Sequence, residues 1–184
     1  SMQIVPGLIK SGVRVIDLSA DYRLKDLKVY SKFYGIKHKD AYNIKNAVYG
    51  LPELNKARIK DARLIANPGC YPTAAILSLA PLITGNLIDL ATVVIDAKSG
   101  ISGAGRKKAE EFLLSPKARE DFKAYKVGIH QHAPEIEQEL SKIGNKKVKV
   151  IFVPHLLPVN VGILETIYVR KKKKGKGAYG RKNG

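Results

Sequence analysis

The sequence contains no tryptophan, one cysteine and one methionine in 184 residues. A single cysteine excludes an internal disulfide, and with only four histidines the chain offers no zinc-ligand set of useful spacing. No apolar run reaches the length of a membrane span, and no charged-then-apolar leader begins the chain. We therefore expect a soluble cytoplasmic protein with no metal and no membrane partner.

Acidic residues are also scarce: 16 Asp and Glu stand against 33 Lys and Arg, for a formal net charge of +17. The excess is uneven, because residues 171–184 carry seven basic side chains and no acidic one. This Gly- and Lys-rich tail is expected to be disordered, and any nucleic-acid contact through it would be sequence-independent and salt-sensitive. Elsewhere lysines are interleaved with acids, as on a solvated surface, so nucleic acid is the less favoured partner.

Apolar periodicity alternates between strand and helix patterns and predicts an α/β fold. The first 66 residues look like the later part of an alternating β/α unit, and the rest predicts a mixed or antiparallel sheet with helices on one face. We expect a division into residues 1–66, 67–170 and 171–184. The expected strands are residues 13–17, 62–66, 92–97, 147–153 and 162–169, and the expected helices are residues 1–10, 26–33, 71–83 and the segment that Pro134 opens.

The cysteine lies in the segment Asn67–Thr73, between a short apolar run and a helix-like run, which predicts a strand, a tight turn and a helix. Pro68 and Gly69 would form the turn, and Pro72 suits the first helical position, where its missing N–H costs nothing. Cys70 would then lie just ahead of the helix N-terminus, where free N–H groups and the helix dipole favour a thiolate. A thiolate is a good nucleophile; the alternative is a small structural cysteine.

A glycine-rich loop, residues 99–106, follows the expected strand at 92–97. Its clustered backbone N–H groups, the hydroxyls of Ser99 and Ser102 and the charge of Arg106 would suit phosphate or another anion. The loop matches neither the Walker motif nor the dinucleotide fingerprint, and a plain strand-to-helix connection is the alternative.

Two histidines, His130 and His132, directly precede the helix that Pro134 is expected to open at its first position. A histidine there could act as general acid or base, since its pKa lies close to neutral pH. A capping or a surface histidine is the alternative. The alternate spacing predicts that at most one of the two faces a site.

The segment Ile65–Thr73 closely resembles the active-site signature of the N-acetyl-γ-glutamyl-phosphate reductase family, which includes enzymes that act on carrier-protein-linked aminoadipyl or glutamyl phosphates. The resemblance covers about residues 1–170 and is not confined to one motif. Further blocks in family order are Val15–Leu24, Tyr49–Leu54, Ala97–Arg106, His130–Ile136 and Val153–Pro158.

The resemblance implies a partial Rossmann-type nucleotide-binding domain, followed by a semialdehyde-dehydrogenase-like α+β catalytic domain with a mixed sheet. It implies NADPH-dependent reduction of an acyl phosphate to a semialdehyde in arginine or lysine biosynthesis, by a homo-oligomer (dimer or tetramer). Cys70 would attack the acyl phosphate and form a thioester. His132 or His130 would be the acid/base partner, and we prefer His132 because it lies directly at the expected helix start.

Other roles follow from the same resemblance. Tyr125 and Glu135 are candidates for supporting contacts. The residues implied for the cofactor are Ser99, Gly100, Ser102, Gly103, Ala104 and Gly105. The residues implied for the substrate and its phosphate are Asn67, Ser19, Arg23 and Arg106.

The chain also departs from the family pattern. No G-x-x-G-x-x-G-type loop precedes Ser1, and the Lys/Gly tail stands where the family continues into a final helix. We therefore expect a fragment with an entire catalytic domain, a partial cofactor domain and weak NADPH binding. Val161 stands where an Arg is expected before Gly162, and valine cannot pair with a substrate carboxylate. The alternatives are a fragment without turnover and a basic nucleic-acid-binding module.

Overall fold

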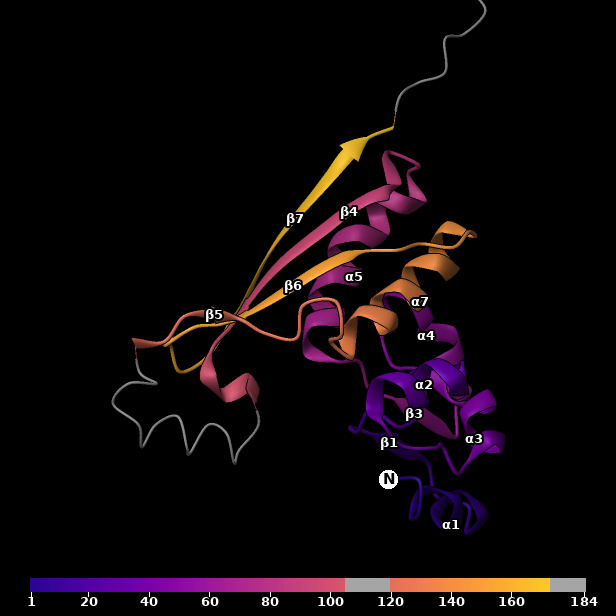
Figure 1. The fold of residues 1–184 in the computed structure, drawn as a ribbon. Coiled ribbons are helices and arrows are strands. Elements are labelled where there is room, and N and C mark those ends of the chain that lie inside the picture. The colour runs from indigo at the N-terminus through magenta and orange to yellow at the C-terminus, as the bar shows by residue number, and fades with distance from the viewer. Residues whose placement is uncertain (105–119, 173–184) are drawn as a thin grey trace, which may run out of the picture.

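The computed structural model describes residues 1–104 and 120–172, which form two sheets with helices packed beside them (Figure 1). The expected α/β class and the mixed sheet are both confirmed. Among the described residues, no helix is long and apolar enough to cross a membrane.

The N-terminal sheet has three short parallel strands in the order β1-β3-β2. Because all three strands run the same way, their carboxyl ends meet at one edge, where α/β proteins place their ligands. Its strands are β1 (Val15–Asp17), β2 (Val48–Tyr49) and β3 (Leu64–Ala66). The helices of this part are α1 (Val5–Lys10), α2 (Leu27–Tyr34), α3 (Ala41–Asn46) and α4 (Pro52–Asp61).

The C-terminal sheet has the strand order β5-β6-β4-β7, with β4 and β6 parallel and the other two pairs antiparallel. Its strands are β4 (Ile88–Ser99), β5 (Lys123–Ala124), β6 (Ile151–Leu156) and β7 (Ile163–Lys171). The helices beside them are α5 (Cys70–Thr84), the short 3-10 helix η1 (Ile101–Ala104) and α7 (His132–Gly144).

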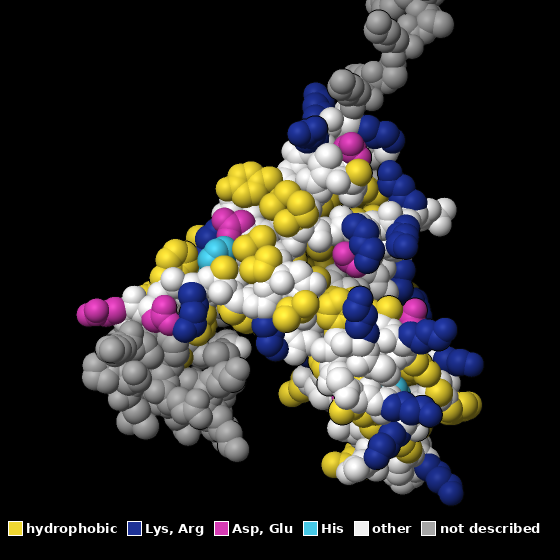
Figure 2. Space-filling view, viewed as in Figure 1, with side chains coloured by type: hydrophobic (Ala, Val, Ile, Leu, Met, Phe, Trp, Pro, Cys, Tyr) yellow, Lys and Arg dark blue, Asp and Glu magenta, His cyan; other side chains and the backbone are white. Residues whose placement is uncertain are grey.

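The main core lies between this sheet and the pair α5 and α7, which pack against each other on one face (Figure 1). Alternate β4 residues such as Ile95 and Ala97 are 0% exposed because they point toward the helices. The opposite face of the sheet is open, and Ile151, Leu164 and Tyr168 on it are more than half exposed. Figure 2 shows hydrophobic side chains gathered over these strands.

Both predicted helix starts are displaced by two residues. Helix α5 begins at Cys70 itself, after Gly69 as its N-cap, so Pro72 is the third helical residue rather than the first. Helix α7 begins at His132, which likewise makes Pro134 third. Proline is tolerated there because the N–H groups of the first turn have no acceptor within the helix.

Two other local predictions need correction. The stretch after α2, expected to be irregular, contains α3, β2 and α4; Asp40 caps α3 by accepting the Asn43 N–H. Strand β6 starts at Ile151, four residues later than predicted, because side chains of α7 accept the N–H groups of Val148 and Val150. Lys171, the first residue of the expected tail, is still part of a strand, because it is the last residue of β7. Residues 173–184 lie outside the described residues.

Candidate active site

Cys70 lies at the carboxyl edge of the N-terminal sheet, at the first residue of α5. The turn before it is joined to neighbouring elements by backbone hydrogen bonds. The Asn67 N–H donates to the Asp17 carbonyl at 2.9 Å, and the Gly50 N–H donates to the Ala66 carbonyl at 2.8 Å. The side chain of Cys70 is exposed and forms no disulfide. The sequence therefore places its one thiol at the meeting point of both sheets.

Gly69 allows two site residues to approach the turn. A Cβ at this position would lie 2.6 Å from His132 Nε2 and 3.0 Å from Arg23 Nη1. Real Cβ atoms essentially never lie within 3.0 Å of another atom, so the contact with His132 would be too close. The backbone of Gly69 is extended (φ −66°, ψ 155°), which any residue can adopt. Space for the two side chains, rather than backbone strain, is therefore what requires glycine here.

The thiol itself is not predisposed to ionise. Burial by the surrounding protein raises the pKa of Cys70, although the N–H groups of Tyr71 and Cys70 and the charge of Arg23 lower it. The predicted N-terminal N–H groups are present, but desolvation outweighs them. Burial thus opposes the thiolate that the helix N-terminus favours, and we expect a base to take the proton when the thiol reacts.

His130 and His132 have different surroundings. The Nδ1 atom of His130 accepts the N–H of His132, the first residue of α7, at 3.1 Å. Its ring packs edge-on against Tyr71, Tyr125 and Phe152, and the residue is 7% exposed. His132 instead lies against Gly69, and its Nδ1 is buried without a hydrogen-bond partner among the described residues.

Both imidazoles are neutral at pH 7. Burial and the nearby His130, Arg23 and Lys126 lower the pKa of His132 to about 3. Burial and Lys126 lower the pKa of His130 to about 4. A neutral imidazole has a free lone pair, so His132 can accept a proton at the start of α5.

Arg23 lies inside the site, but the protein already occupies its donors. Its Nε donates to the Asn67 carbonyl at 2.7 Å and its Nη2 to the Leu18 carbonyl at 3.1 Å. Its Nη1 lies 3.5 Å from Oε2 of Glu135, a residue with 0% exposure. The predicted substrate residue Asn67 is thus held by Arg23 through its carbonyl, and its side-chain amide donates to the Pro68 carbonyl at 3.2 Å.

The glycine-rich loop does not offer the predicted nest of free N–H groups. The N–H groups of Gly100, Ile101 and Ser102 donate to carbonyls of the 159–162 segment, and that of Gly103 donates to Gly100. The anion cradle is therefore wrong for residues 100–103. Residues 105–119, including the predicted Gly105 and Arg106, lie outside the described residues.

The glycines of the loop serve close packing instead. A Cβ on Gly100 would meet the Val159 carbonyl at 2.8 Å, and one on Gly103 would overlap the Ser99 hydroxyl. Ser99 is 4% exposed and is the last residue of β4, on the side of the strand that faces the helices. Burial raises the pKa of the Tyr71 hydroxyl, and Ser99 lowers it by a smaller amount. Ser99 therefore connects the loop to the first turn of α5, and Ala104 ends η1.

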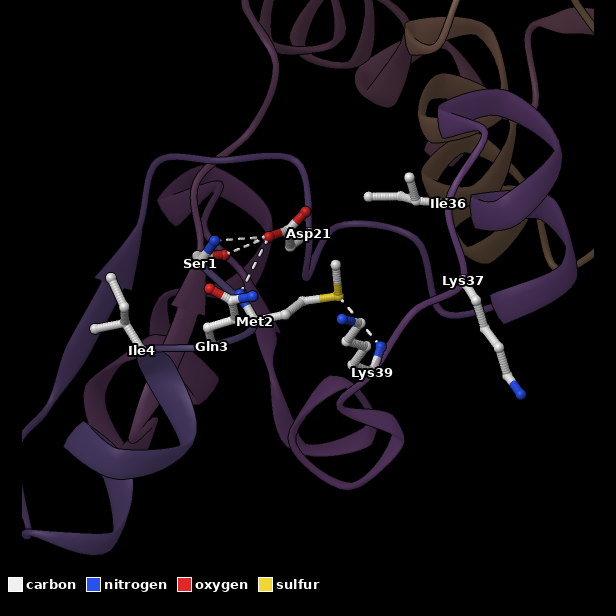
Figure 3. Close-up of a pocket in the computed structure, with 8 residues that line it drawn as sticks. All are labelled: Ser1, Met2, Gln3, Ile4, Asp21, Ile36, Lys37 and Lys39. Carbon is white, nitrogen blue, oxygen red and sulfur yellow. Dashed lines mark hydrogen bonds and ion pairs between the residues drawn. The ribbon is translucent and has the colours of Figure 1, made fainter.

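Ser19 belongs to a separate polar cluster after β1. Its hydroxyl donates to the Asp17 carboxylate at 2.9 Å and accepts the Asp21 N–H at 3.1 Å. Figure 3 shows the cavity beside this cluster, where Ser1 and Met2 donate to the Asp21 carboxylate. The cavity has a volume of about 540 Å³ and contains neither Cys70 nor either histidine in its lining. The contacts of Ser19 are thus within this cluster.

Two family models match the chain. The semialdehyde dehydrogenase NAD binding domain matches residues 1–62, and the semialdehyde dehydrogenase dimerisation domain matches residues 70–181. The chain belongs to the semialdehyde dehydrogenase family. Cys70 is the first residue of the second matched segment, and His132 lies within that segment.

Curated proteins of similar sequence point to one kind of enzyme within this family. The chain is 51% identical over 168 residues to an N-acetyl-gamma-glutamyl-phosphate reductase of Syntrophobacter fumaroxidans, and 52% identical over 168 residues to one of Methanococcus maripaludis. Each alignment covers 91% of this chain and 48% of the relative. The resemblance drawn from the motifs is therefore confirmed, and the chain spans about half the length of these curated relatives.

Solved structures agree on the fold. The aspartate semialdehyde dehydrogenase II of Vibrio cholerae matches with a TM-score of 0.66 and 18% identity, over 92% of this chain and 52% of that one. The aspartate semialdehyde dehydrogenase of Francisella tularensis matches with a TM-score of 0.64 and 17% identity, over 95% and 56%. At this identity the likeness concerns the arrangement of the elements.

Sequence reasoning missed the part played by Tyr49. Its hydroxyl donates to Glu135 Oε1 at 2.8 Å, the same oxygen that accepts the Gly69 N–H at 2.8 Å. Tyr49 and Glu135 are 86 residues apart, so no local pattern signals the contact. Tyr125, the other expected support, has its hydroxyl 3.4 Å from that of Tyr71.

Proposed function

We propose that this chain carries the nucleophile and the base of a reductase that converts N-acetyl-γ-glutamyl phosphate to its semialdehyde with release of phosphate, in arginine biosynthesis. The observation that carries the proposal is the placement of Cys70 at the start of α5, with His132 Nε2 packed against Gly69. The names of the relatives supply the substrate class.

The first step needs only residues of this chain. His132 takes the proton of the Cys70 thiol, and the thiolate attacks the acyl carbon. The bond from that carbon to the phosphate oxygen breaks, phosphate leaves with the electron pair, and a thioester forms. The N–H groups of Cys70 and Tyr71, at the positive end of α5, stabilise the charge on sulfur while it lasts.

A nicotinamide cofactor, which we take to be NADP(H), supplies the hydride that brings the acyl group to the aldehyde level. The carboxyl edge of β1, β3 and β2 fits such a group, because nucleotides bind at that edge of parallel sheets. Of the predicted cofactor residues, Ser102 and Gly103 are exposed and are proposed to contact it. Ser99 and Gly100 are proposed to shape the loop through their packing.

Substrate binding is assigned around the same turn. We propose that Asn67 and Arg23 hold the turn against which the acyl phosphate lies, and that Ser19 and Arg106 contribute polar groups. A carrier-protein-linked acyl phosphate is the alternative substrate. A homo-oligomer is proposed through the open face of the C-terminal sheet, since the matched domain is described as a dimerisation domain.

Phosphate release in the absence of nicotinamide tests the proposal. Mixed with N-acetyl-γ-glutamyl phosphate, the chain is expected to release one equivalent of phosphate per Cys70, and the Cys70→Ser variant none above the spontaneous rate. A folded chain that releases no phosphate from either the free or the carrier-linked acyl phosphate would contradict the proposal.

A further inference from the structure

A buried carboxylate connects α7 to the cysteine turn and to the N-terminal sheet. Glu135 is 0% exposed and belongs to the first turn of α7. Its Oε1 accepts hydrogen bonds from the Gly69 N–H and the Tyr49 hydroxyl, each at 2.8 Å. Its Oε2 lies 3.5 Å from Arg23 Nη1 and has no hydrogen bond within the described residues.

Burial raises the pKa of Glu135, whereas the charge of Arg23, the Gly69 N–H and the Tyr49 hydroxyl lower it and favour the carboxylate. A buried carboxylate is costly unless such partners hold it, so this arrangement fixes all its members together. Gly69 is the residue immediately before Cys70 and the N-cap of α5. Tyr49 is 3% exposed and ends β2, so its hydroxyl fixes Glu135 from the N-terminal sheet. Movement of Glu135 would therefore move the turn that carries the thiol.

We propose that Glu135 and Tyr49 are positioning residues for the Cys70–His132 pair, an inference that rests on the proposed function. Glu135 holds the Gly69 N–H and balances the charge of Arg23, and Tyr49 holds Glu135 in place. The Tyr49–Leu54 block and Glu135, both singled out by the family resemblance, are thereby joined in one contact.

The groups around the thiol make this role measurable. Arg23 lowers the pKa of Cys70 and Glu135 raises it. The charge of a Cys70 thiolate in turn raises the pKa values of the Tyr71 and Tyr125 hydroxyls, which are neutral. His132, also neutral, reaches the turn at Gly69. A Glu135→Gln change keeps an oxygen for the Gly69 N–H but removes the negative charge, which leaves Arg23 unbalanced beside the sulfur.

The test is alkylation of Cys70 by iodoacetamide as a function of pH, followed by intact mass, because the chain has no other thiol. Glu135→Gln is expected to move the midpoint to lower pH and to speed alkylation at pH 7 by about three- to tenfold, tenfold being one pH unit. Tyr49→Phe is expected to lower the midpoint pH by a smaller amount, because loss of its hydrogen bond makes Glu135 easier to protonate.

Glu139→Gln is the matched control. Glu139 is also buried and lies one turn further along α7, but it bonds to Gln138 and Lys142 rather than to the cysteine turn. Its profile is expected to superimpose on that of the unmodified chain. The inference is overturned if folded Glu135→Gln keeps the alkylation profile of the unmodified chain, or if Glu139→Gln shifts that profile by the same amount. If Glu135→Gln does not fold, Tyr49→Phe decides, and an unshifted profile in that variant overturns the inference.

Alkylation needs neither acyl phosphate nor nicotinamide, so the two proposals fail separately. A chain that shows the shift but takes no acyl group contradicts the proposed function. A chain that takes the acyl group but shows no shift contradicts only the positioning role.

Discussion

At the scale of single residues, the site depends on the absence of a side chain at Gly69. The positions of His132 Nε2 and Arg23 Nη1 leave no room for a Cβ there, while the extended backbone would accept one. Burial raises the pKa of the thiol, so we expect the neutral His132 to act as its base from close by. The space at Gly69 is therefore what brings base and nucleophile to the same turn.

Gly69→Ala should separate packing from backbone effects. The added methyl group displaces His132, so we expect acyl transfer to Cys70 to slow at least tenfold and the free energy of unfolding to fall by about 1–3 kcal/mol. Rapid-mix mass spectrometry and urea unfolding measure the two effects. Gly7→Ala, where a Cβ would meet nothing within 4 Å, is the control: it should leave acyl transfer unchanged and, because Gly7 is helical, raise the free energy of unfolding by up to about 1 kcal/mol rather than lower it. Full acyl transfer in Gly69→Ala would contradict the packing account.

At the scale of elements, each of the two helices at the site begins at a residue that we propose takes part in the chemistry. Helix α5 starts at Cys70 and α7 at His132, and in each the proline sits at the third position. The sequence predicted both helices, most strands and the cysteine turn, because periodicity and turn residues are local signals. It did not predict that the loop N–H groups at 100–102 are already bonded, since their acceptors lie about 60 residues away.

The start of α7 also makes stability depend on pH. The pKa of His130 is about 4 in the folded chain, below its ordinary value of 6.5, so the unfolded chain binds the proton first as pH falls. The free energy of unfolding therefore falls as pH drops below about 6.5, by at most about 1.4 kcal/mol per pH unit for one histidine.

His130→Asn should reduce this loss. Asparagine offers an oxygen to the His132 N–H but does not titrate, so between pH 7 and pH 5 we expect it to lose about 1 kcal/mol less stability than the unmodified chain. Urea unfolding at the two pH values measures the difference. Equal losses in both chains would show that His130 is not the buried neutral histidine described.

At the scale of the whole molecule, the two faces of the C-terminal sheet differ. One is covered by α5 and α7, and the other carries a row in which the strand pairing places Ile151, Val94 and Tyr168 side by side. Ile151 is 61% and Tyr168 57% exposed, a large apolar surface for a face without a partner. On the face that Figure 2 shows, many lysines and arginines lie away from this apolar row.

Tyr168→Lys should weaken self-association if this face joins two copies. A lysine at this end of the row cannot be buried without a partner, so the sedimentation coefficient should fall to that of a smaller species at micromolar concentration. Tyr42→Lys adds the same charge at a position that is 76% exposed on α3, and should leave assembly unchanged. The same sedimentation for all three chains would place the contact elsewhere.

The intact mass of the chain after incubation with N-acetyl-γ-glutamyl phosphate, without nicotinamide, tests the central claim most directly. The account predicts one added acyl group, located on Cys70, that is absent in Cys70→Ser and forms at least tenfold more slowly in His132→Asn. A folded chain that gains no acyl group, or a Cys70→Ser variant that still gains one, would contradict it.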